Sequence, residues 1–294
     1  MANIREIQSR INSVKDTMKI TNAMYMISSS KMTHARKKLA DTEPYFYALQ
    51  GEIARILRHV PDLKQPFFDR RERIPEEERK VGIIVITADK GLAGAYNHNV
   101  LKLADEMLSK PGIHKLFVAG ELGRRYFAKR NVEIDTNFQY TVQKPTLHRA
   151  RDISAEILEQ FVKGELDEIH VVYTRMENSV QMEAETMMLL PLQKSAFNQA
   201  QIPLNMYREE ISLYPSAEDV FRMILPDYIT GMIYGCFVEA YASEHNARMM
   251  AMKSATDSAQ SLIKELSIVY NRARQAEITQ EITEVCSGAR AQKK

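Results

Sequence analysis

The sequence predicts an α/β protein that combines a long antiparallel coiled coil of the N- and C-terminal helices with a central Rossmann-like α/β domain. Three observations support this prediction. Largely apolar positions alternate at spacings of three and four at both ends of the chain, short β-branched runs alternate with helical patterns in the middle, and no proline follows Pro226. The first pattern is typical of a coiled-coil seam, and the second of a mostly parallel sheet covered by helices.

The N-terminal helix is predicted from one narrow stripe of largely apolar residues. The stripe occupies positions 4, 7, 11, 14, 18, 21, 25, 28, 32, 35 and 39, and the same spacing frame continues at 46, 49, 53, 56 and 60. Pro44 lies inside this frame and has no backbone donor, so we expect a kink or a restart there, with Thr42 available as a cap. A helix over residues 3–59 would be about 85 Å long at ~1.5 Å per residue, too long for a compact domain.

The C-terminal helix is predicted from the same alternation at positions 252, 255, 259, 262, 266, 269, 273 and 276. A helix from Asp227 to Arg290 would be about 95 Å long. Gly231 and Gly235 form a GxxxG step, which we expect to pack closely against the sheet domain. An apolar stripe on a projecting helix needs a second surface to cover it. The two terminal helices are therefore expected to pair and to bury each other's stripe.

The middle of the chain predicts a sheet. Strands are expected at 81–87, 115–119 and 168–174, with an edge strand at 181–192 that Pro191 closes, and helices at about 95–110, 121–130 and 145–163. The resulting division is an N-terminal helix at 1–60, a linker at 61–80, the α/β domain at 81–194, a linker at 195–216 and a C-terminal helix at 217–294.

The near-neutral total charge hides two opposed regions. The chain has 40 Lys and Arg against 38 Asp and Glu, a net charge of +2. Residues 1–40 carry eight basic and two acidic side chains, a net +6, and residues 245–294 carry eight and five, a net +3, which leaves −7 for residues 41–244. Basic helices of this kind could follow a nucleic acid or sit against acidic protein loops. The first 40 residues contain Tyr25 as their single aromatic, which disfavours nucleic acid.

Several classes of protein are excluded. Two cysteines, Cys236 and Cys286, cannot build a disulfide framework or a structural zinc site, and the seven histidines are scattered. The longest uncharged apolar stretch, 228–238, falls far short of the ~20 residues that span a bilayer. The N-terminus does not read as a secretory signal or transit peptide, so we expect a soluble protein that can still dock on a membrane assembly.

The most enzyme-like segment runs from Thr87 to Asn97, after a strand and at the start of a helix, where phosphates bind in many α/β proteins. Gly91 and Gly94 match neither GxGxxG nor a Walker motif, so a tight strand-to-helix turn is the simpler interpretation. We therefore predict no catalytic, cofactor-binding or metal-binding residue. A cofactor-binding α/β enzyme with helical arms and a coiled-coil nucleic-acid binder remain as alternatives at this point.

Four segments of the chain match one known family. They are the C-terminal run 278–291 (ITQEITEVCSGARA), the N-terminal block from Arg5 to Met32, the turn at 89–97 and the segment 172–192. By these segments the chain resembles the gamma subunits of F-type ATP synthases, whose signature the C-terminal run matches. Ala93 stands where many members have Cys, and the acidic residue often found before Pro215 is missing. The regulatory cysteine insert of chloroplast members is also absent, so the bacterial form is expected.

This resemblance implies a rotor shaft that couples ion flow through the membrane ring to ATP synthesis or hydrolysis by rotation, without itself being a catalyst. Its partners would be three alpha and three beta subunits, the epsilon subunit and the membrane rotor ring, with one copy per complex. It would be a peripheral membrane protein on the cytoplasmic face of the bacterial cell membrane. By the same resemblance, Met24 would lie near acidic lever loops of beta, and Arg274, Gln275 and Thr279 would meet the beta loops that grip the shaft.

Overall fold

The computed structural model describes residues 4–130, 132–178, 181–197 and 212–291. The chain divides into two compact units, one formed by Met1–Ser29 with Arg248–Lys294 and the other by Ser30–Ala247. Two long helices, α1 (Ile4–His59) and α6 (Ala217–Ala291), each contribute to both units.

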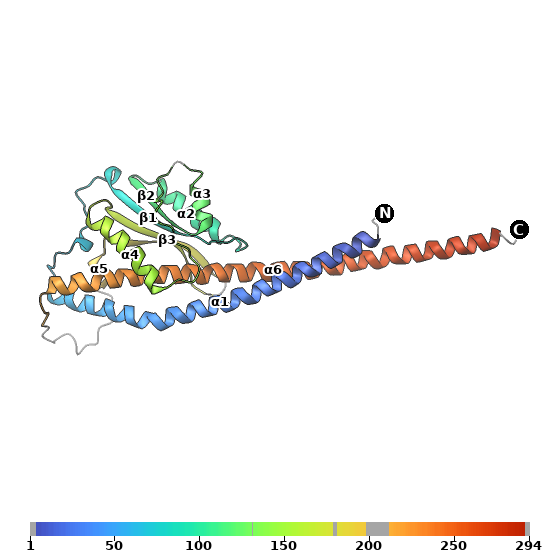
Figure 1. Cartoon of the computed structure of the whole chain (residues 1–294), viewed down its shortest axis with the longest axis horizontal. Helices are drawn as coiled ribbons and strands as arrows, with labels where there is room; N and C mark the ends of the chain where they lie inside the picture. The colour runs from blue at the N-terminus through green and yellow to red at the C-terminus, as the bar shows by residue number, and fades with distance from the viewer. Residues whose placement is uncertain (1–3, 131, 179–180, 198–211, 292–294) are drawn as a thin grey trace. The chain divides into compact units, whose positions relative to one another are not determined.

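The larger unit, Ser30–Ala247, contains the predicted sheet (Figure 1). Its strands are β1 (Lys80–Ile86), β2 (Ile113–Ala119), β3 (Glu168–Met176) and β4 (Met182–Leu190), arranged in the order β2-β1-β3-β4. β1 pairs in parallel with β2 and β3, and β4 runs antiparallel to β3 at the edge. The predicted strands, the mostly parallel sheet and the edge position of 181–192 are confirmed.

Helices cover both faces of this sheet because alternate strand residues point to opposite sides. α2 (Tyr96–Leu108) and α3 (Glu121–Phe127) pack on the face that carries Val81, Ile83 and Val85. α4 (Leu147–Val162) and parts of α1 and α6 pack on the face that carries Ile84 and Ile86. The three predicted helices of the α/β domain are therefore confirmed, with ends shifted by at most three residues.

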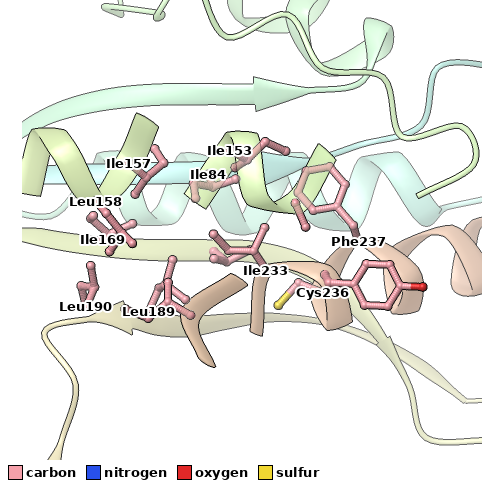
Figure 2. Close-up of a cluster of buried hydrophobic side chains, with 14 of the residues drawn as sticks. Ile84, Ile153, Ile157, Leu158, Ile169, Leu189, Leu190, Ile233, Cys236 and Phe237 are labelled. Carbon is pink, nitrogen blue, oxygen red and sulfur yellow. The ribbon is translucent and has the colours of Figure 1, made fainter. Parts of the chain in front are cut away.

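Figure 2 shows the centre of the second face, where side chains from the sheet, α4 and α6 meet. All of these side chains are buried, and they form one core that joins the long helices to the sheet. The members labelled in Figure 2 are Ile84, Ile153, Ile157, Leu158, Ile169, Leu189, Leu190, Ile233, Cys236 and Phe237. Because this core is continuous, the sheet and the parts of α1 and α6 within Ser30–Ala247 belong to one compact unit.

The helix α6 begins at Ala217, the first residue of the segment 217–294 expected as the C-terminal helix and ten residues before Asp227, from which its length was estimated. Ser216 acts as its cap, since the hydroxyl Oγ accepts a hydrogen bond from the backbone N–H of Asp219 at 3.1 Å. Pro226 lies within the helix, and the Thr230 hydroxyl donates to the Pro226 carbonyl at 2.8 Å. The Ser216 cap and the buried Phe221 and Leu225 stabilise the turns before the proline, which the length estimate from Asp227 left out.

The helix α1 continues through Pro44, so the predicted restart is wrong. Thr42 does not cap a new helix; its hydroxyl donates instead to the carbonyls of Lys38 and Leu39, both at 3.0 Å. Packing of the flanking residues explains the continuity. Leu39 and Phe46 on either side of the proline pack against the buried core, which holds both turns in helical geometry.

The GxxxG step of α6 packs differently from the prediction. A Cβ atom added at Gly231 would lie 2.1 Å from a ring carbon of Phe46, whereas one added at Gly235 would meet nothing within 4 Å. Gly231 therefore allows close approach of α6 to α1 within the larger unit, and not of α6 to the sheet. One glycine of the step, and not two, makes the close contact.

The first linker is fixed to the sheet by Arg71. Its guanidinium donates at 2.6 Å to the Leu166 carbonyl, to the Asp167 carboxylate and to the Phe161 carbonyl. The other oxygen of Asp167 accepts from the backbone N–H of Lys80 at 2.9 Å, at the start of β1. Short helices η1 (Pro66–Phe68), η2 (Glu76–Glu78) and α5 (Lys194–Phe197) complete the described connections. Residues 198–211 of the second linker lie outside the described residues, and the division into five segments stays a prediction.

Candidate functional site

The smaller unit is a pair of helices with a narrow buried seam, formed by α1 up to Ser29 and α6 from Arg248. Ile7, Ile11 and Ala259 are buried at predicted seam positions. The hydroxyls of Thr21 and Thr256 are hydrogen-bonded across the pair at 2.8 Å. The two segments run in opposite directions (Figure 1), so the predicted antiparallel coiled coil is confirmed in this unit.

The seam ends before the predicted last position. In an antiparallel pair, the register set by Thr21 and Thr256 places Ile4, where α1 begins, opposite residue 273. Val269 is already 47% exposed, and α6 is exposed at every position from 274 to 289. Positions 269 and 276 were predicted to be buried, and that prediction was wrong. In this register position 276 lies beyond the start of α1, and position 269 lies opposite Gln8, in the first turns of α1.

The end of α6 carries an exposed apolar face. Ile278, Ile282 and Val285 are spaced i, i+4 and i+7, which places them on one side of the helix, and Val285 is 72% exposed. Burial of a side chain of this size is favourable by about 1.5–3 kcal/mol. A helix with this face is stabilised when a partner surface encloses it. The i, i+4, i+7 spacing is visible in the sequence, but its exposure depends on where α1 begins.

A second exposed face lies on α1, in the same unit. Ile20 and Ile27 are one heptad apart and more than half exposed, as is Met26. Arg10 and Lys15 are exposed on the same segment, and the Lys19 ammonium pairs with Asp16 at 2.9 Å. The face is therefore apolar with basic neighbours, which suits an acidic protein surface better than a nucleic acid.

The four side chains predicted to contact partners lie in this unit but in two places. Arg274, Gln275 and Thr279 are exposed on consecutive turns of α6, and the Thr279 hydroxyl donates to the Gln275 carbonyl at 2.8 Å. Met24 is half-buried on α1, opposite residue 253 in the same register. The structure groups the first three with the apolar face at 278–285 and separates Met24 from them. That apolar face is the part of the candidate site that the sequence interpretation missed.

Side-chain hydrogen bonds hold the turn between β1 and α2. The Thr87 hydroxyl accepts from the Gly123 N–H at 3.0 Å, and the Asn97 side chain accepts from the Ala88 N–H at 2.8 Å. The Asp89 carboxylate accepts from the Glu121 N–H at 3.1 Å and from the Thr141 hydroxyl. A carboxylate inside the turn repels phosphate, which supports the interpretation of 87–97 as a structural turn.

The glycines of this turn are used unequally. Gly94 has a left-handed backbone, with φ of +54°, and an added Cβ there would meet nothing within 4 Å. The other left-handed residue of the turn is Leu92, with φ of +62°, and not Gly91. Of the two glycines expected to make the turn, only Gly94 therefore has the left-handed backbone that favours glycine.

A buried acidic cluster lies between β3, β4 and α6 in the larger unit. The Tyr173 hydroxyl donates to Glu185, and the Cys236 thiol is buried beside them. One carboxylate oxygen of Glu239, Oε2, is buried and has no hydrogen-bond partner among the described residues. Burial raises the pKa of Glu239 above its ordinary value of 4.5; the charges of Glu185 and Glu43 raise it further, and Arg175 opposes them.

Glu239→Gln is expected to stabilise the chain at pH 8 and to lose that advantage as the pH falls. From pH 4.5 up to the raised folded-state pKa, the folded chain holds a proton that the unfolded chain releases, so stability falls as pH rises. Glutamine carries no such penalty. Thermal unfolding of the full chain at pH 8 should show a Tm rise of about 2 °C. Glu183→Gln, an exposed change on β4, is the control, and an equal rise in both variants would contradict this account.

Within the described ranges, no three His, Cys, Asp or Glu side chains are placed to hold a metal ion. In the same ranges, no helix combines the length and the apolar character that crossing a membrane requires.

Comparison with known proteins identifies the family. Residues 3–292 match the family described as ATP synthase. The ATP synthase gamma chain of Ruminiclostridium cellulolyticum is 42% identical over 98% of both chains, and that of Acetivibrio thermocellus is 40% identical over the whole of both. The fold matches a chain of the Euglena gracilis mitochondrial ATP synthase (OSCP/F1/c-ring, rotational state 3), with a TM-score of 0.63 at 17% identity over 98% of this chain and 94% of that one. The chain belongs to the ATP synthase gamma chain family.

Proposed function

We propose that this chain is the central rotor shaft of an ATP synthase, which couples ion flow through a membrane ring to ATP synthesis or hydrolysis by rotation. The observation that carries the proposal is the helix pair of the smaller unit. Its seam is buried internally, while the apolar face at Ile278, Ile282 and Val285 is exposed beyond it. A shaft needs both features, because it must be stiff along its axis and must present a surface to an enclosing sleeve.

The shaft acts through unequal contacts. A helix pair that changes to a single helix along its length is not symmetric about its axis, so three identical beta subunits around it meet three different faces. Each face favours one beta conformation by its difference in contact free energy, and rotation exchanges the three. The chain is a non-catalytic subunit in this scheme, and the ATP-binding residues belong to its partners.

The partners are three alpha and three beta subunits, the epsilon subunit and the membrane rotor ring, with one copy of this chain per complex. The chain is a peripheral protein on the cytoplasmic face of the bacterial cell membrane. Met24 and the basic residues near it contact acidic lever loops of beta. Arg274, Gln275 and Thr279 contact the beta loops that grip the shaft, which their exposure on α6 supports.

Reconstitution tests this function. The purified chain should have no ATPase activity alone, and a tagged chain should co-purify with alpha, beta and epsilon from cells that express all four. Addition of the chain to isolated alpha and beta should raise their ATPase activity. ATP turnover by the chain alone, or recovery of the tagged chain without these subunits, would contradict the proposal.

Met24→Lys is expected to reduce the coupling of ATP hydrolysis to ion pumping. A lysine there adds positive charge beside acidic loops of beta. The added attraction strengthens one contact between the shaft and beta during the rotation cycle and slows the release of that contact. The expected result is a fall of about twofold or more in ion gradient per ATP hydrolysed, a difference of about 0.4 kcal/mol or more in one step.

The ion gradient and the ATPase rate should be measured together in membrane vesicles. Met188→Lys makes the same chemical change on β4 of the sheet and should leave the coupling ratio unchanged. An unchanged ratio in Met24→Lys would contradict the placement of Met24 near acidic loops.

A further inference from the structure

A cavity lies at the amino ends of β1, β2 and β3, on the face of the sheet covered by α2. Its volume is about 220 Å³, and its charged and titratable lining residues are Glu76, Arg79, Lys110, His114, Glu168 and His170. The strand register brings three of them together. His114 on β2 and Glu168 on β3 pair with the same residue of β1, Val81, and His170 follows two residues after Glu168 on the same face.

The carboxylate of Glu168 is already satisfied. Its Oε1 accepts from Arg79 Nη1 at 2.6 Å, and its Oε2 lies 3.2 Å from His170 Nε2. Arg79 also donates through Nη2 to the Ile74 carbonyl at 3.1 Å. Glu76 is exposed to solvent, so water screens its charge. The acidic groups of the cavity therefore leave little negative charge available to its remaining donors.

Several donors of the cavity lack an acceptor. Arg79 Nε is buried and has no hydrogen-bond partner within the described part of the chain. Lys110 is exposed to solvent, and its ammonium contacts only the Met107 thioether sulfur, at 3.2 Å, among the described side chains. Thioether sulfur is a weak acceptor. A buried donor without an acceptor, such as Arg79 Nε, costs about 1–3 kcal/mol, so a ligand that supplies acceptors is favoured here.

We propose that this cavity binds a small free oxyanion such as inorganic phosphate. Oxyanions offer several acceptor oxygens around one centre, which matches convergent donors from Arg79, Lys110 and His114. The cavity is smaller than the roughly 300–1,000 Å³ of sites for drug-sized ligands, so a whole nucleotide does not fit. This site is in the sheet domain and does not depend on the rotor function proposed above.

Binding at this site depends on pH. With both histidines neutral, Arg79 and Lys110 balance Glu76 and Glu168, so the cavity has no net charge. Burial, and to a smaller degree the nearby His170, lower the pKa of His114 below its ordinary value of 6.5. A bound anion favours protonated His114, so binding takes up a proton and is stronger at acidic pH.

Calorimetric titration of the full chain tests the proposal. Inorganic phosphate should bind with a Kd of about 1 mM at pH 6.5, and AMP should not compete with it. Lys110→Met should weaken binding at least about tenfold, because a hydrogen bond to a charged group is lost. Lys102→Met changes an exposed lysine on α2, which ends just before Lys110, and should leave the Kd unchanged. Absence of binding, equal binding by the two lysine variants, or competition by AMP would overturn the proposal.

The role of His114 has its own test, with sulfate as the probe because its charge is constant between pH 6 and 8. Sulfate should bind about threefold or more tightly at pH 6 than at pH 8. His114→Gln should remove that difference while it retains most of the affinity at pH 8. A pH dependence that survives in His114→Gln would overturn the assignment of His114 to the site.

Discussion

Arg71→Ala is expected to destabilise the larger unit by about 3 kcal/mol, the lower end of the range for removal of one partner of a buried ion pair. The Arg71 and Asp167 side chains are only 15% and 6% exposed and are 2.6 Å apart. The guanidinium also lies over the Phe161 ring, with its central carbon 4.5 Å from the ring centre. Alanine would leave Asp167 and the carbonyls of Phe161 and Leu166 without this donor.

Urea unfolding of the purified full chain measures this effect. Arg73→Ala, an exposed arginine in the same linker, is the matched control and should change the free energy of unfolding by less than about 0.5 kcal/mol. Arg71→Lys should recover only part of the stability, because an ammonium cannot reach three acceptors in the planar geometry of a guanidinium. Equal stability of the two alanine variants would contradict the assigned role of Arg71.

Gly231→Ala is expected to destabilise the chain by about 1–3 kcal/mol through overpacking, whereas Gly235→Ala should stabilise it by about 0.5–1 kcal/mol. The two glycines lie one turn apart on α6, and alanine has the higher helix propensity at both. The difference is Phe46, whose ring carbon would be 2.1 Å from the new Cβ at position 231. Thermal unfolding followed by circular dichroism compares the two variants directly.

A double variant separates the clash from other causes. Phe46→Leu is smaller at the contact and should recover part of the loss in Gly231→Ala, which gives a coupling free energy of about 1 kcal/mol between the two positions. If Gly231→Ala and Gly235→Ala stabilised the chain equally, the close approach of α1 and α6 at Gly231 would be wrong.

Local patterns predicted most of the fold correctly. The β-branched run at 81–87 and the alternation of strands and helices identified the sheet, because strand periodicity and length are properties of short segments. The three–four alternation identified both seams for the same reason. The restart expected as one alternative at Pro44 does not occur, because Leu39 and Phe46 pack into a core that the local pattern does not reveal. The segment 217–294 expected as the C-terminal helix begins where α6 begins, and only the length estimate from Asp227 left out the turns that Ser216 caps.

The candidate site was predicted less completely. Arg274, Gln275 and Thr279 were taken from a family resemblance, and they lie beside the exposed apolar face at 278–285. That face could not be told from a buried seam by its spacing alone, since both follow helical periodicity. The register between Thr21 and Thr256 determines whether that face is buried or exposed, because it fixes where α1 begins alongside α6. A register depends on two segments far apart in sequence.

The central claim is that this chain rotates inside a ring of alpha and beta subunits. The direct measurement is single-molecule rotation of a complex of alpha, beta and this chain fixed to a surface by beta. A bead can be attached at Lys129→Cys, an exposed position of the sheet domain, in a chain that also carries Cys286→Ser to remove its exposed native thiol. With ATP, the bead should turn in one direction and pause at three orientations about 120° apart, as the threefold arrangement of beta requires. A bead that stays fixed while the same complexes hydrolyse ATP would contradict the account.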